Sequence, residues 1–148
     1  MKTKEEFTKL FELKKIQTDF PQVGITSSTD AEKFIRQFYG DDIDVFESFF
    51  ILLLNRNNHT IGYAKISQGG ISGTVIDVRI IAKYAIEALA TGVIAAHNHP
   101  SGNLNPSDND IAITKKIKDA LNILDIQLYD HVLLTKEGYF SFGNNNLM

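Results

Sequence analysis

Apolar residues follow two patterns along this chain: continuous runs, and stripes with a spacing of three or four. The continuous runs cover residues 45–54 and 92–96. Neither run alternates polar with apolar residues, so both predict strands that are buried on both faces. Turn residues 55–58 separate the first run from 60–67, which predicts a hairpin with an antiparallel partner strand. Shorter extended segments are predicted at 74–76, 126–128, 131–134 and 139–142.

Stripes with helical spacing and their capping residues predict four helices. One covers 79–90, and another follows the loop 97–110 and runs for about 14 residues. Two capping boxes open helices predicted over 3–15 and 29–40. We expect the first of these two to pack its apolar stripe on the domain. Together the elements predict an α/β fold, a single domain with a mixed, twisted sheet flanked by helices on both faces.

Length and composition support one ordinary globular domain. A chain of 148 residues can bury roughly 70% of its unfolded surface in a single core. Hydrophobic residues make up 43% of the chain and charged residues 22%. No apolar run approaches the roughly 20 residues of a membrane span, and the N-terminal residues lack the apolar core of a signal peptide. We therefore expect a soluble, cytoplasmic protein without a membrane partner.

Charge and cysteine content exclude several classes of function. The chain contains no cysteine, which removes disulfides, thiolate catalysis, cysteine-based zinc sites and the nucleobase deaminases. A net charge of -3 and a pI near 5.8 argue against a surface built to bind phosphate backbones, although a local basic patch would be compatible with them. Nucleic acid is therefore a disfavoured partner. No sequence feature specifies an oligomeric state.

The loop 97–110 carries the clearest chemistry in the sequence. His97 and His99 leave the end of a strand two residues apart, which places both imidazoles on one face. Ser107 is the predicted N-cap of the next helix, so Asp110 lies in its first turn and can turn its carboxylate back to the same point. Zinc in proteins is bound by sets such as these two imidazole nitrogens and one carboxylate oxygen. Three protein ligands leave a fourth position for water, as in catalytic zinc sites.

Simpler explanations exist for some of these residues. A carboxylate in the first turn stabilises a helix by roughly 0.3–1 kcal/mol without any metal, and Asp108 could do this as well as Asp110. His131 follows Asp130, and a structural histidine hydrogen-bonded near the sheet is the favoured interpretation. A supporting role behind a metal ligand is the alternative for His131.

The loop resembles a known motif. His-x-His, seven residues and then Ser-x-x-Asp is similar to the JAMM signature of JAB/MPN metalloproteases, and residues 97–102 (His-Asn-His-Pro-Ser-Gly) resemble the RadC branch of bacteria. The similarity covers about 45–142. It implies a JAB/MPN, cytidine-deaminase-like architecture with Zn²⁺ held by His97, His99 and Asp110. It also implies a glutamate as general base, whose place Glu47 occupies, and a serine, Ser107, whose hydroxyl steadies the oxyanion.

The resemblance implies a zinc-dependent metallohydrolase that cleaves a peptide or isopeptide bond, with a peptide or protein conjugate as substrate. It divides the chain into an N-terminal helical segment, 1–40, packed on the domain, and a RadC-like JAB/MPN domain, 41–148. RadC proteins with a helix-hairpin-helix DNA-binding element carry a longer N-terminal region, for which 1–40 offers no counterpart. Two alternatives stay open, a DNA repair or DNA-associated accessory protein and a metal-stabilised interaction module without activity. The presence of Glu47 and Ser107 favours an enzyme over such a module.

Overall fold

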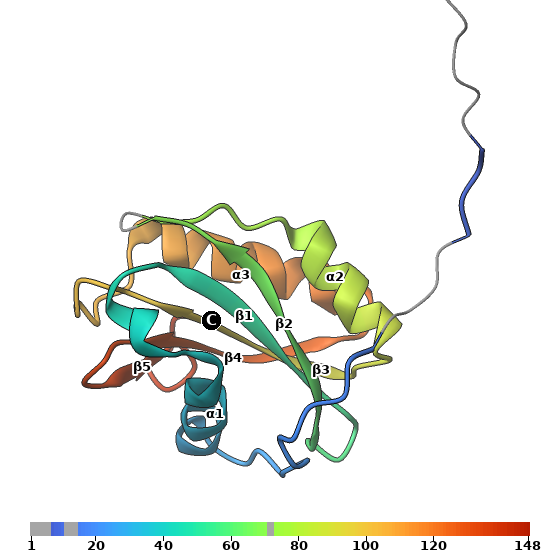
Figure 1. Cartoon of the computed structure of the whole chain (residues 1–148), viewed down its shortest axis with the longest axis horizontal. Coiled ribbons are helices and arrows are strands. Elements are labelled where there is room, and N and C mark those ends of the chain that lie inside the picture. The colour runs from blue at the N-terminus through green and yellow to red at the C-terminus, as the bar shows by residue number, and fades with distance from the viewer. Residues whose placement is uncertain (1–6, 11–14, 71–72) are drawn as a thin grey trace, which may run out of the picture.

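Five strands form one mixed sheet, in a computed structural model that describes residues 7–10, 15–70 and 73–148 (Figure 1). Their order across the sheet is β2-β1-β3-β4-β5. The bounds are β1 (Ser48–Leu54), β2 (Thr60–Gln68), β3 (Gly92–Asn98), β4 (Gln127–Leu134) and β5 (Tyr139–Ser141). The central pair β3 and β4 is parallel, and each of the other neighbouring pairs is antiparallel.

Helices cover both faces of this sheet. Figure 1 shows α2 (Val78–Glu87) and α3 (Asp108–Ile123) on one face and α1 (Ser28–Ile35) on the other. Two short 3-10 helices, η1 (Arg36–Phe38) and η2 (Asp41–Asp44), connect α1 to β1. This is the predicted α/β fold. Within the described part of the chain, no helix combines the length and the apolarity needed to cross a bilayer.

The buried central strands divide the core into two layers. β1 and β3 are buried along their whole length, as their apolar runs predict. Because successive strand residues point to opposite faces, Val93 and Ala95 pack toward α2 and α3, whereas Ile94 and Ala96 pack toward α1. The same alternation carries His97 to the α2 and α3 face and Asn98 to the α1 face.

The N-terminal region differs from its prediction. Much of the helix predicted over 3–15 lies outside the described residues, and residues 7–10 are exposed without helical structure. The next helix, α1, begins at Ser28 and not at the predicted Thr29 box, because the Ser27 hydroxyl accepts a hydrogen bond from the backbone N–H of Asp30. It continues through η1 and ends before Gly40 as predicted.

Three strand predictions need correction. The run 45–54 becomes a strand only at Ser48, because the N–H groups of residues 45 and 46 both donate to the carbonyl of Asp42 in a tight turn. The segments predicted at 126–128 and 131–134 form the single strand β4. Finally, β3 extends to Asn98, so His97 and Asn98 belong to the strand and the loop begins at His99.

Candidate functional site

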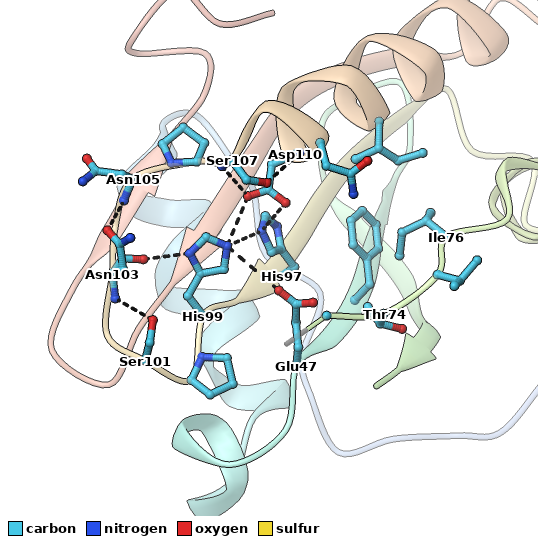
Figure 2. A pocket seen from close by; sticks show the side chains of 17 residues that line it. Glu47, Thr74, Ile76, His97, His99, Ser101, Asn103, Asn105, Ser107 and Asp110 are labelled. Carbon is cyan, nitrogen blue, oxygen red and sulfur yellow. Dashed lines mark hydrogen bonds and ion pairs between the residues drawn. The ribbon is translucent and has the colours of Figure 1, made fainter. Parts of the chain in front are cut away.

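Strand register brings the predicted site residues together. β1 and β3 are antiparallel, and Phe49 pairs with His97. Glu47 lies two residues before Phe49, and His99 lies two residues after His97. Because side chains two residues apart in a strand point to the same face, Glu47 and His99 lie on the same face of the sheet. The first turn of α3 supplies Asp110 above the same point (Figure 2). Residues from three elements thus meet at one end of the sheet.

The polar atoms of the site lie at short and similar distances. Nε2 of His97 is 3.2 Å from Nε2 of His99. The Asp110 carboxylate lies 3.3 Å from Nε2 of His97 and 3.1 Å from Nε2 of His99, each through a different oxygen. Glu47 is further away, with Oε1 3.9 Å from Nε2 of His99. One ligand atom each from Glu47, His97 and His99 also lies within 4.8 Å of the others, so these three residues could hold a metal ion.

These distances are similar in size to those between the ligand atoms of a bound metal ion. Ligand atoms bound at about 2.0–2.1 Å in a tetrahedron are about 3.3 Å from one another. The closest approaches among the three side chains are of this size: the two Nε2 atoms are 3.2 Å apart, and Asp110 lies 3.3 Å from His97 through Oδ1 and 3.1 Å from His99 through Oδ2. Electron-rich atoms this close repel one another unless protons or a cation lie between them. The donor set therefore suits a divalent cation that accepts nitrogen and oxygen ligands.

Hydrogen bonds at the far side of each ring orient the two histidines. Nδ1 of His99 lies 2.7 Å from the carbonyl oxygen of Asn103, which can only accept. Nδ1 of His99 must therefore carry the hydrogen, and in the neutral ring Nε2 offers its lone pair to the site. Nδ1 of His97 contacts Nε2 of His131 at 2.7 Å. His131 is fully buried and stacks on the Phe142 ring. His131 is thus a buried, hydrogen-bonded histidine, as predicted, and its partner is a predicted ligand, which is the contact that the alternative supporting role requires.

Asp110 and Ser107 form a capping box at the start of α3. The Ser107 hydroxyl accepts from the backbone N–H of Asp110, and Asp110 Oδ2 accepts from the N–H of Ser107 at 2.8 Å. The predicted N-cap is confirmed. Because the same Oδ2 also contacts His99, the cap and the site share one carboxylate. Of the two carboxylates in the first turn of α3, Asp110 and not Asp108 contacts the histidines.

Burial and charge shift the protonation of these groups. Burial alone would raise the pKa of the Asp110 carboxyl, but its contacts with both imidazoles and the hydrogen bond from the Ser107 N–H hold that pKa far below its usual range. The Asp110 carboxylate raises the pKa of His99, because it accepts a hydrogen bond from Nε2 only when the ring is protonated. Burial raises the pKa of Glu47, and the two histidines offset this only in part. A carboxyl with a raised pKa is a better proton acceptor and donor near neutral pH.

Asn98 fixes the segment that carries Glu47. Its side chain is fully buried on the face opposite the histidines. The amide oxygen accepts from the N–H of Ser48 at 2.7 Å, and the amide NH₂ donates to the carbonyls of Ile43 and Phe46 at 2.6 and 2.8 Å. Asn98 thus ties the chain before β1 to the end of β3.

A cavity of about 780 Å³ opens over the site. Figure 2 shows Glu47, His97, His99 and Asp110 directed toward its centre, with Thr74 and Ile76 on one side and Ser101, Asn103 and Asn105 on the other. One wall is largely apolar, and it is formed by Phe49, Val75, Ile76 and Ile113. The opposite wall is the polar loop after β3. Ser107 lines the cavity as well, so all five predicted site residues border it.

Thr114 is a residue of the site region that sequence reasoning missed. Its hydroxyl lies 2.6 Å from Nδ1 of His131. A signal was available in the sequence, because Thr114 is a polar residue on the same buried helical stripe as Ile117 and Leu121. A polar group at a buried position needs a partner, and His131 supplies it.

Comparison with known proteins places this architecture in a family. Residues 25–147 match the RadC-like JAB domain. A UPF0758 protein of Flavobacterium johnsoniae is 48% identical over 123 residues, which cover 83% of this chain and 53% of that protein. A UPF0758 protein of Porphyromonas gingivalis is 39% identical over 125 residues, or 84% of this chain and 54% of the relative. The chain thus spans about half the length of the curated relatives it matches. From this match and the sheet and loop described above, the chain belongs to the RadC-like JAB domain family.

Proposed function

We propose that this domain is a zinc-dependent metallohydrolase of the JAMM type that cleaves peptide or isopeptide bonds. The observation that carries the proposal is the spacing of its donor atoms. Nε2 of His97 lies 3.2 Å from Nε2 of His99, and the two Asp110 carboxylate oxygens lie 3.3 Å and 3.1 Å from these nitrogens. A fourth group, Glu47, lies 3.9 Å from His99, close enough to contact a water molecule at the site without belonging to the closest set.

The donor chemistry supports zinc among the common divalent ions. Calcium and magnesium favour sites built from oxygen, whereas His97 and His99 contribute imidazole nitrogens. Zn²⁺ held by these two residues and Asp110 would supply a Lewis acid that polarises a carbonyl and lowers the pKa of water. With three protein ligands, such a site keeps a position open, which is the pattern of catalytic zinc centres.

In this proposal Glu47 moves the proton. Its carboxylate accepts a proton from the attacking water as the new C–O bond forms at the carbonyl carbon. It then delivers this proton to the nitrogen of the leaving amine as the C–N bond breaks, so water is divided between the two products. The raised pKa of Glu47 supports both transfers, because it brings the carboxyl closer to working pH.

Ser107 stabilises the oxyanion in this proposal. Its oxygen accepts the capping hydrogen bond from Asp110, so the hydroxyl hydrogen can be donated toward the cavity that Ser107 lines. A donor aimed at the position where negative charge develops contributes more in the transition state than in the ground state. The capping bond also holds the oxygen in place before substrate binds.

The first experiment is elemental analysis of protein purified without chelators or added metal, with His99→Ala as the control. We expect one zinc per chain in the parent protein and loss of that zinc in the variant. Zinc-free parent protein that also fails to take up added zinc would contradict the proposal.

The second experiment separates an enzyme from the alternatives. Peptide and isopeptide libraries are incubated with the zinc-loaded parent and with Glu47→Gln, which keeps the size and one oxygen of the side chain. An enzyme loses turnover in this variant but keeps zinc, whereas an interaction module shows no turnover in either protein. A DNA-associated protein would instead bind duplex DNA with an affinity that falls steeply with salt.

A further inference from the structure

A chain of hydrogen bonds runs behind the candidate metal centre from α3 to His97. The Thr114 hydroxyl lies 2.6 Å from the carbonyl oxygen of Asp110 and 2.6 Å from Nδ1 of His131. Nε2 of His131 lies 2.7 Å from Nδ1 of His97. These contacts link two proposed zinc ligands, Asp110 and His97, through residues that do not themselves face the cavity.

The hydrogens of this chain can be arranged in one way. A carbonyl oxygen only accepts, and a hydroxyl has one hydrogen, so Thr114 must donate to Asp110 and accept from His131. Nδ1 of His131 therefore carries the hydrogen, and in the neutral ring Nε2 is bare. This bare nitrogen accepts from Nδ1–H of His97, which leaves Nε2 of His97 with a free lone pair toward the site.

Packing prevents the His131 ring from turning to another arrangement. The ring is fully buried and stacks on Phe142, with ring centres 4.4 Å apart and an angle of 12° between the planes. Phe49 contacts it from another side, edge to face, at 5.4 Å between the ring centres. The aromatic contacts fix the plane of the ring, and the two hydrogen bonds fix its orientation within that plane.

We propose that Thr114 and His131 are positioning residues that set the tautomer of His97, so that its Nε2 is a ready metal ligand. This inference rests on the proposed zinc site. In this proposal His97 carries its hydrogen on Nδ1 and offers the lone pair of Nε2 to the site, as His99 does because of its contact with the Asn103 carbonyl. Hydrogen-bond partners of ligating histidines orient the ring and raise its basicity, and their loss commonly weakens metal binding about 10–100-fold.

The test uses a matched pair of variants at one position. Thr114→Val keeps the shape of the side chain but removes the hydroxyl, and Thr114→Ser keeps the hydroxyl. Zinc affinity is measured by competition with a chelator of known affinity, and near-UV circular dichroism verifies that both variants fold. We expect Thr114→Val to bind zinc about 10–100-fold more weakly than the parent and Thr114→Ser to remain close to the parent. Equal affinities in the two variants would overturn the inference.

A second measurement needs no metal and no variant. Long-range ¹H–¹⁵N spectra of the metal-free parent at pH 8 report which ring nitrogen of each histidine is protonated. We expect His131 to carry its hydrogen on Nδ1. A hydrogen on Nε2 of His131 would refute the proposed chain of hydrogen bonds. A parent protein that binds no zinc would instead overturn the proposed function. The tautomer of His131 would still show whether the chain of hydrogen bonds from Thr114 to His97 exists.

Discussion

Replacing Asn98 by alanine should destabilise the fold more than any exposed asparagine substitution. The side chain is fully buried and makes three hydrogen bonds, all to backbone groups of residues 43–48. A net contribution of about 0.5–1.5 kcal/mol for each gives a loss of roughly 1.5–4.5 kcal/mol in the free energy of unfolding. Backbone groups left buried without a partner add to this cost.

Urea denaturation followed by circular dichroism measures this loss by linear extrapolation. Asn122→Ala is the control, because Asn122 is exposed on α3. Its change should reflect helix propensity alone and stabilise the protein by no more than about 0.7 kcal/mol. If Asn98→Ala costs less than about 1 kcal/mol, the three hydrogen bonds do not hold the segment before β1, and the reasoning fails.

Three further predictions concern the site and its supports. Burial raises the pKa of Glu47, so ionisation of this carboxyl lowers the stability of the fold as the pH rises above the pKa of about 4.3 that the group has in the unfolded chain. Metal-free Glu47→Gln should therefore be more stable than the parent at pH 7 and equally stable near pH 3. A difference in melting temperature that does not change with pH would contradict this. An alanine Cβ at Gly69 would lie 1.9 Å from the carbonyl oxygen of Gly73, whereas at Gly70 it meets nothing within 4 Å. Gly69→Ala should therefore lower the melting temperature and Gly70→Ala should not, and equal melting temperatures would count against the close approach of Gly69 to Gly73. Zinc at 100 times its dissociation constant should stabilise the parent by about 2.7 kcal/mol, and His99→Ala should lose this gain in the same thermal assay.

Local sequence features predicted the parts of the site that local interactions build. The N-cap at Ser107 and the position of Asp110 depend only on neighbouring residues of α3. The common face of His97 and His99 follows from the period of a strand. In contrast, four consecutive hydroxyl residues at 26–29 can each cap a helix, which is why the predicted cap at Thr29 differs by two residues from the observed N-cap, Ser27.

Features that depend on strand pairing could not be read from the sequence. The distance between Glu47 and His99 is set by the register of β1 against β3, and only the family resemblance placed Glu47 in the site. Thr114 and His131 meet across 17 residues of sequence, through the packing of α3 on β4. Asn98 reaches residues 50 or more positions earlier. Tertiary contacts of this kind follow from the assembled sheet and not from any one segment.

The shared carboxylate at the start of α3 has a thermodynamic consequence for metal affinity. Ser107 holds the Asp110 side chain through the cap, while Asn103 and His131 hold the rings of His99 and His97. These three side chains have therefore lost their rotamer freedom on folding, before any ion arrives. Immobilising a side chain on binding costs about 0.5–1.5 kcal/mol of free energy. Three ligands that are already fixed therefore reduce the entropic cost of metal binding by roughly 1.5–4.5 kcal/mol. At 1.4 kcal/mol for each factor of ten, that preorganisation is equivalent to about one to three orders of magnitude in metal affinity.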